Sequence, residues 1–227
     1  MSEKLRTEFN QWALDGRGAA MESHHLPFVE SVIEMMALEP RDRCLEVGCG
    51  EGWASRLLAQ QVPEGSVVGL DVSDEMVRNA RAKSAACENL MLIQAEAEDI
   101  PWQDGFFSKV LCVESFYYYE DPEKALREIY RVMSPGGSVW IVNHLSKENE
   151  LSLRWVQELK VPVQLLSVEE YGALFERCGY SGFTHRMIPD RSPLPEDYRD
   201  ASFPDPGDLR RFRELGALVI SARKPDQ

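Results

Sequence analysis

The chain reads Cys44-Leu-Glu-Val-Gly-Cys-Gly-Glu-Gly52, a short apolar strand that runs directly into three glycines at alternate positions. Glycine adopts positive φ angles without strain and places no Cβ between the main chain and a ligand. Residues 53–59, which follow, carry apolar side chains at helical spacing. The glycines therefore mark a strand-to-helix turn whose exposed backbone N–H groups are suited to hold a nucleoside cofactor.

A second cofactor signal lies downstream of this turn. Residues 66–71 read Ser-Val-Val-Gly-Leu-Asp, another short strand, and its last residue, Asp71, stands 21 positions after Gly50. A carboxylate at this offset is placed to accept hydrogen bonds from both hydroxyls of an adenosine ribose. The turn and Asp71 together predict a cofactor that contains adenosine.

The glycine pattern does not match the two common phosphate-binding turns. A dinucleotide-binding turn needs a third glycine for close helix packing, and Trp53 stands at that position. A nucleotide-phosphate loop needs Gly-Lys-Ser/Thr, and this turn contains no lysine. Glu46 and Glu51 make the turn acidic, which favours a cofactor without phosphates that carries a sulfonium cation and an amino group.

Three further segments accompany residues 44–52 in a fixed order. They read Leu-Asp-Val-Ser-Asp-Glu-Met at 70–76, Ala-Glu-Ala-Glu-Asp-Ile-Pro-Trp at 95–102 and Ala-Leu-Arg-Glu-Ile-Tyr-Arg-Val-Met-Ser-Pro-Gly-Gly at 125–137. Together the four segments resemble the class I S-adenosylmethionine-dependent methyltransferases, and more narrowly the small-molecule group that includes the ubiquinone and menaquinone C-methyltransferases. The resemblance covers roughly residues 41–142.

The resemblance implies S-adenosyl-L-methionine as the cofactor and assigns residues to its parts. Gly48 and Gly50 are expected against the methionine and ribose parts, Asp71 on the ribose, and Val72 and Met76 on the faces of the adenine. The complete set of cofactor-binding residues that we expect is Glu46, Gly48, Cys49, Gly50, Asp71, Val72, Met76, Glu96, Ala97 and Val113.

Apolar patterning predicts an α/β fold with a Rossmann-like, doubly wound and mostly parallel sheet. Strands are expected near 43–47, 66–70, 90–94, 108–113 and 138–142, followed by two more near 182–188 and 215–222. Helices are expected near 53–60, 74–86 and 122–132, and Pro135-Gly136-Gly137 is expected to end the last of these with a turn. The resemblance implies seven strands, of which the last runs antiparallel.

The chain is expected to form a single methyltransferase domain over residues 1–227. A helical N-terminal cap occupies 1–38, a cofactor-binding core occupies 39–143, and substrate-side insertions and the last strands occupy 144–227. Because open α/β sheets bind ligands at the carboxyl ends of their strands, segments 1–38, 144–167 and 189–210 are expected to wall the acceptor pocket.

Charge and apolar patterning argue against two kinds of partner, nucleic acids and membranes. The formal net charge is −13 and the basic residues are dispersed, so a nucleic acid partner is disfavoured. The triplet Arg210, Arg211 and Arg213 is interpreted as a solvated helix face, with a local basic patch as the alternative. No apolar run approaches the roughly 20 residues that cross a bilayer, and the first residues lack a signal-peptide core, so a cytoplasmic protein without membrane contact is expected.

The five cysteines are scattered and show no pair at the close spacing of metal ligands. An odd number of cysteines within expected strands and helices indicates reduced and mostly buried thiols. No metal site is predicted from the sequence.

Methyl transfer from a sulfonium is an in-line displacement, so the protein mainly has to hold the nucleophile beside the methyl carbon. A base is needed only where the nucleophile arrives protonated. Candidate catalytic residues are His25, which precedes the Pro27 helix, His144, which follows the fifth strand, and Tyr117, which follows the fourth. The alternatives are a structural histidine in both cases and a core aromatic for Tyr117.

These features predict a methyltransferase that acts on a small-molecule acceptor through oxygen, nitrogen, sulfur or carbon. The sequence gives no indication of the oligomeric state. One alternative is a user of the same fold that transfers an aminopropyl group, for which Glu114 and Glu120 would have to face the cleft as an acidic pair. A second alternative is a regulatory protein that binds the cofactor without turnover.

Overall fold

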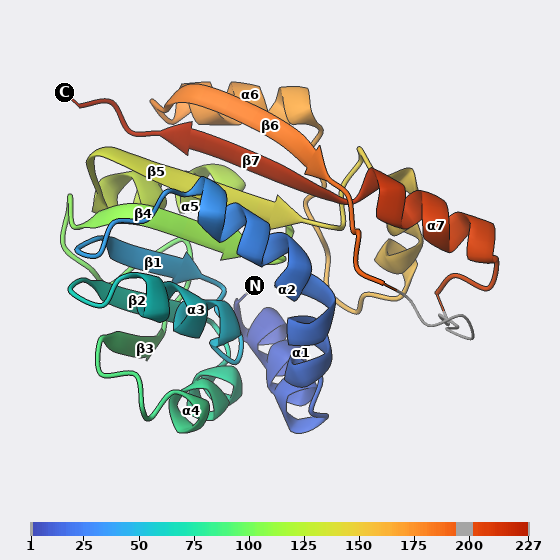
Figure 1. The fold of residues 1–227 in the computed structure, drawn as a ribbon, viewed down its shortest axis with the longest axis horizontal. Coiled ribbons are helices and arrows are strands. Elements are labelled where there is room, and N and C mark those ends of the chain that lie inside the picture. Colours follow the sequence, from blue (N-terminus) through green and yellow to red (C-terminus); the bar gives the residue numbers. More distant parts are fainter. Residues whose placement is uncertain (1, 194–201, 227) are drawn as a thin grey trace.

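The computed structural model describes residues 2–193 and 202–226, and its centre is a seven-stranded sheet with the order β3-β2-β1-β4-β5-β7-β6 (Figure 1). The first five strands pair in parallel, whereas β7 runs antiparallel between β5 and β6. This arrangement confirms the expected Rossmann-like sheet and its antiparallel last strand. The strands are β1 (Arg43–Val47), β2 (Ser66–Asp71), β3 (Leu90–Gln94), β4 (Phe107–Val113), β5 (Met133–Asn143), β6 (Ser181–Ile188) and β7 (Ala217–Arg223).

Helices cover both faces of the sheet (Figure 1). One buried cluster joins α2 and α3 to the sheet, and another joins α5 and α6 to its opposite face. The helices are α1 (Ser2–Leu14), α2 (Gly18–Met35), α3 (Trp53–Gln61), α4 (Asp74–Lys83), α5 (Pro122–Val132), α6 (Val168–Arg177) and α7 (Pro206–Leu215), with 3₁₀ segments η1 (Phe116–Tyr118) and η2 (Glu150–Gln157).

Short polar residues begin the helices that border the carboxyl ends of the strands. The Ser73 hydroxyl accepts a hydrogen bond from the Met76 N–H at the start of α4, and Asp121 does the same for the Lys124 N–H at the start of α5. Each cap satisfies a backbone donor that the first helical turn leaves free. The strands therefore pass into helices at fixed points along one edge of the sheet.

The central strands are apolar on both faces, as parallel strands covered by helices must be. In β1, Cys44 contacts the cluster of α2 and α3, while Leu45 and Val47 contact the cluster of α5 and α6. From α5, Leu126 and Ile129 are fully buried against this second face. The core thus fixes the sheet from both sides and leaves its carboxyl edge for ligands.

Two details of the sequence prediction are wrong. Pro135-Gly136-Gly137 does not form a turn after the helix, because β5 begins at Met133 and a register shift opposite residues 107–109 accommodates Gly136 at a φ of 73°. Helix α4 ends at Lys83 instead of near residue 86. Residues 144–167, which follow β5, contain the 3₁₀ segment η2.

Two arginines of the basic triplet are paired with acidic side chains. Arg211 and Arg213 of the basic triplet form ion pairs with Glu150 and Asp190, at 2.9 and 2.7 Å.

The five cysteines are free thiols, and four of them are buried. Within the described part of the chain, no helix combines the length and apolar character needed to span a bilayer.

Candidate functional site

A cavity of 390 Å³ lies at the carboxyl ends of β1, β2 and β4. The turn after β1, the end of β2 and the residues after β3 form one side of it, and α1, α2 and η1 close the other. All ten residues expected to bind the cofactor line this one cavity, so the fold brings them together: Glu46, Gly48, Cys49, Gly50, Asp71, Val72, Met76, Glu96, Ala97 and Val113. Their individual contacts with a cofactor stay predictions.

The glycine turn is held by the end of β2. Gly50 has a φ of 51° and donates its N–H to Asp71 Oδ2 at 2.8 Å. The other carboxylate oxygen, Asp71 Oδ1, accepts the Ser73 N–H at the same distance. The carboxylate therefore fixes both the turn and the start of α4, and each of its oxygens retains lone-pair capacity for a ribose hydroxyl.

Gly50 also leaves space for a ligand. A Cβ added at this residue would meet no atom within 4 Å, although Gly50 lines the cavity. A Cβ at Gly48, by contrast, would lie 2.3 Å from the Ser115 Cβ. The first position is open toward the cavity, whereas the second is a glycine because the end of β4 packs against it.

Glu46 is a buried carboxyl group at the end of β1. It is 2% exposed and accepts a hydrogen bond from the Ser55 hydroxyl of α3. Burial raises the pKa of Glu46 to about 8, with a smaller contribution in the same direction from Asp71, so the group holds a proton at neutral pH. A cationic ligand group beside Glu46 would favour its ionised form.

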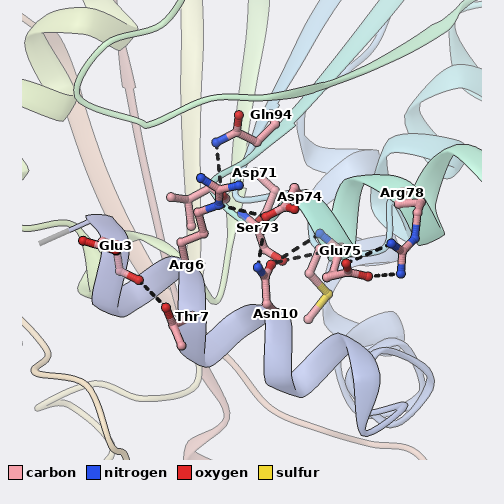
Figure 2. Close-up of polar contacts among 12 residues, drawn as sticks. Glu3, Arg6, Thr7, Asn10, Asp71, Ser73, Asp74, Glu75, Arg78 and Gln94 are labelled. Atoms are coloured by element: carbon pink, nitrogen blue, oxygen red, sulfur yellow. Dashed lines mark hydrogen bonds and ion pairs between the residues drawn. The ribbon is translucent and has the colours of Figure 1, made fainter.

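Polar contacts join α1 to the start of α4 (Figure 2). Asn10 Oδ1 accepts hydrogen bonds from the Ser73 hydroxyl at 2.6 Å and the Glu75 N–H at 3.3 Å, and Asn10 Nδ2 donates to Asp74 at 3.0 Å. Arg6, one turn earlier, forms an ion pair with the same Asp74 carboxylate at 2.8 Å. These contacts hold Leu5 and Phe9 of α1 against the cavity.

The three candidate catalytic residues meet around Glu114. His25 of α2 lines the cavity, whereas His144 after β5 and Tyr117 of η1 lie buried behind Glu114. The Tyr117 hydroxyl donates to Glu114 Oε2 at 2.9 Å, and the His144 backbone N–H donates to Glu114 Oε1 at 2.5 Å. One ligand atom from each of His25, Glu114 and His144 lies within 4.8 Å of the others.

The pKa values of the ionisable groups in this cluster are shifted in different directions. Burial lowers the pKa of His25 to about 4, so its imidazole is neutral at neutral pH. Burial disfavours ionisation of Glu114, but the hydrogen bonds with His144, together with the charge interactions with His25 and His144, outweigh that cost and lower the pKa of Glu114. Burial raises the pKa of Tyr117 far above its ordinary value, so its phenol stays protonated and serves to hold Glu114.

Only one of the three segments expected to wall the pocket does so. Residues 1–38 contribute Leu5, Phe9, Gly18, Met21 and His25, but the described residues of 144–167 and 189–210 contribute none. Apolar side chains of residues 144–167 instead form a separate cluster around Leu145 and Val161, which packs against η1 and α1. The expected role of residues 194–201 lies outside the described residues.

Comparison with known proteins agrees with this geometry. Residues 45–141 match the family described as Methyltransferase domain. Over 190 residues the chain is 32% identical to the demethylmenaquinone methyltransferase of Listeria monocytogenes. The aligned residues cover 79% of this chain and 77% of that protein.

Solved structures show the same fold. A chain from the complex between the Haloferax volcanii Trm112 methyltransferase activator and a methyltransferase is 30% identical, with a TM-score of 0.89 over 96% of this chain and 98% of its own. An S-adenosylmethionine-dependent methyltransferase of Aquifex aeolicus is 20% identical and superposes with a TM-score of 0.61 over 86% of this chain and 88% of its own.

Asn10→Ala is expected to loosen α1, because it removes the hydrogen bonds that join this helix to the start of α4. Hydrogen exchange measured by mass spectrometry should accelerate in residues 2–14 and remain unchanged in β1 and β4. Thr7→Ala is the matched control, since the Thr7 hydroxyl bonds only to the Glu3 carbonyl within α1. Equal exchange in both variants would show that Asn10 does not anchor the helix.

Glu46→Gln is expected to flatten the pH dependence of stability in the absence of ligand. Because the pKa of Glu46 is raised from 4.5 to about 8 by folding, the folded state binds the extra proton between these values and loses stability as the pH rises. The wild type should lose up to about 1.4 kcal/mol per pH unit relative to the variant. Parallel urea unfolding profiles from pH 5 to 8 would contradict this pKa assignment.

Proposed function

The chain belongs to the S-adenosylmethionine-dependent methyltransferases, and from this we propose that it methylates a small molecule held beside the cofactor in the 390 Å³ cavity. The single observation that carries the proposal is the closure of this cavity by α1. Leu5 and Phe9 of α1 and Tyr118 of η1 add an apolar wall to this cavity. Small-molecule pockets typically combine such walls with a few polar groups.

The proposed mechanism is an in-line displacement in which positioning supplies most of the rate. Asp71 would hold the ribose hydroxyls and Glu46 the amino group of S-adenosylmethionine, whose bound form supplies the activated methyl group. The reacting atom of the acceptor would face His25 and Glu114, which line the cavity away from Asp71. Such positioning corresponds to effective molarities of about 10⁵–10⁸ M.

We propose an acceptor with a flat apolar ring and an ionisable substituent. The relatives that are about 30% identical over four fifths of this chain are named for methylation of demethylmenaquinone. The aromatic side chains of Phe9, Tyr118 and Tyr119 border the cavity and suit a planar ring. The free thiols of the chain support a reducing compartment such as the cytoplasm.

The two alternatives from the sequence are less well supported. Glu114 and Glu120 both line the cavity, as aminopropyl transfer would require. However, Glu114 already accepts hydrogen bonds from Tyr117 and His144, and the relatives are methyltransferases. A regulatory protein without turnover would not need the apolar acceptor space beside the cofactor turn.

We also propose that this chain binds an activator protein of the Trm112 type. The support is the similarity over 96% of this chain to a chain of the Haloferax volcanii complex. Co-expression with a Trm112-type protein should give a 1:1 complex by size-exclusion chromatography with light scattering. Separate elution of the two proteins at micromolar concentration would contradict this proposal.

The acceptor proposal is tested by methyl transfer from S-adenosylmethionine carrying a labelled methyl group. A panel of reduced naphthoquinols and phenols, a total RNA fraction and a protein extract are offered in parallel, with and without the activator. Label is expected in a small aromatic product identified by mass spectrometry. Incorporation into RNA or protein alone would contradict a small-molecule acceptor.

Gly50→Ala is expected to weaken binding of S-adenosylmethionine by about tenfold or more, because the new methyl group projects into the space expected for the cofactor. Its backbone strain should cost about 1–2 kcal/mol of stability. Gly105→Ala is the control, since Gly105 also has a positive φ, 65°, and open space around a Cβ but lies outside this cavity. Unchanged affinity in the Gly50 variant by calorimetry would remove this turn from the cofactor site.

A further inference from the structure

Three potential metal ligands converge at the acceptor end of the cavity from distant parts of the chain. His25 lies in α2, Glu114 follows β4 and His144 follows β5, and one nitrogen or oxygen of each lies within 4.8 Å of the others. His144 Nδ1 is 3.4 Å from Glu114 Oε1. Two imidazoles and one carboxylate are a ligand set that zinc and other divalent transition metals prefer.

Neighbouring groups hold Glu114 as they hold carboxylates in metal centres. Glu114 Oε2 accepts the Tyr117 hydroxyl and Oε1 accepts the His144 backbone N–H, and each oxygen retains further lone-pair capacity. Its backbone has a φ of 49°, which a residue other than glycine rarely adopts. Such strain at a ligand-lined site is typical of a side chain held in a required direction.

The two histidines are also oriented by their surroundings. The imidazole ring of His25 packs on that of His144, with their centroids 5.1 Å apart. The edge-to-face contact of Phe28 with His144, with centroids 4.1 Å apart, holds the second ring in apolar surroundings. Ligands that are fixed by outer contacts of this kind characterise metal centres.

The charge of the cavity favours a cation at this position. The ion-pair partner that the structure gives Glu114 is His144, and neither a lysine nor an arginine reaches its buried carboxylate among the described residues. Lys124 is the one lysine or arginine among the lining residues, which include eight acids: Glu46, Glu51, Asp71, Glu96, Glu98, Glu114, Glu120 and Asp121. A buried carboxylate with neither a lysine nor an arginine beside it is stabilised by a metal ion.

We propose that His25, Glu114 and His144 bind one divalent transition metal ion of the zinc class, with a coordination position open to the cavity for an oxygen or sulfur atom of the acceptor. This inference rests on the proposed function and narrows the acceptor to molecules with an ionisable hydroxyl or thiol. No sequence pattern indicates this site, because its ligands are separated by 89 and 30 positions.

The role of the ion follows from its charge. Binding of the acceptor hydroxyl or thiol to the ion lowers the pKa of that group, and its proton passes to solvent water. The electron pair of the resulting anion, located on the heteroatom or on a conjugated ring carbon, forms the bond to the methyl carbon. Where a ring carbon reacts, that carbon then loses its hydrogen as a proton to solvent water, which restores the aromatic ring. The carbon–sulfur bond of the sulfonium breaks, and its electron pair remains on sulfur as a neutral thioether.

The test is a titration of metal-free protein with Co²⁺, followed by visible absorption, and competition with Zn²⁺. The wild type should bind one equivalent with d–d bands typical of nitrogen and oxygen ligation. His25→Ala should weaken the affinity at least tenfold, and His25 borders the cavity rather than the core, so this variant should fold. His24→Ala is the matched control, because His24 is exposed, outside the cavity and adjacent in α2, and its affinity should equal that of the wild type.

The inference is overturned if the wild type binds no stoichiometric metal or if His25→Ala and His24→Ala bind it equally. It is also overturned if the chelated enzyme methylates a phenol or thiol acceptor at the rate of the metal-loaded enzyme. The last result would leave the proposed function intact. Stoichiometric metal binding together with methylation of RNA or protein alone would instead contradict the proposed function and retain the metal site.

Discussion

The Asp71 carboxylate is the interaction on which the site depends. Its two oxygens accept the N–H groups of Gly50 and Ser73, so one side chain joins the turn after β1 to the start of α4. The turn can follow this path because its glycines adopt positive φ angles that other residues resist. A ligand that binds Asp71 is consequently placed against Gly50, in space that no side chain occupies.

Helix α1 converts this open edge of the sheet into a cavity. Asn10 joins α1 to Ser73, the same residue whose backbone bonds to Asp71, so the closure of the cavity and the cofactor turn share one anchor. The opposite end of the cavity is built differently. There Glu114 is held by Tyr117 and His144, and His25 reaches it from α2. Asp71 and Glu114 thus border the same cavity from the ends of two different strands, β2 and β4.

Local patterns were sufficient to predict the sheet and the residues that line the cavity around Gly50 and Asp71. The segment 44–52 and Asp71 depend on backbone geometry and short spacing, which a single sequence records. The prediction was wrong at Pro135-Gly136-Gly137, because pairing with β4 and β7 extends β5 through residues that favour a turn. The expected wall at 144–167 was wrong for a related reason, since apolar side chains of this segment pack against η1 and α1 instead of lining the cavity.

The surroundings of Glu114 were less predictable, because they arise from tertiary contacts. His25, His144 and Tyr117 were singled out separately, but no pattern indicated that they surround Glu114 or that Asn10 anchors α1. The raised pKa of Glu46 likewise arises from burial beneath α3, which its position in the motif does not reveal. The sequence therefore shows these residues one at a time, and only the folded structure shows which side chains they contact.

The central claim is that the turn after β1 holds the adenosyl group with its ribose on Asp71. The most direct measurement is a crystal structure of the protein with S-adenosylhomocysteine. The account predicts both ribose hydroxyls within hydrogen-bonding distance of the Asp71 carboxylate, the backbone of Gly50 against the ligand and the sulfur directed toward His25 and Glu114. An adenosyl group bound elsewhere, or a ribose turned away from Asp71, would contradict it.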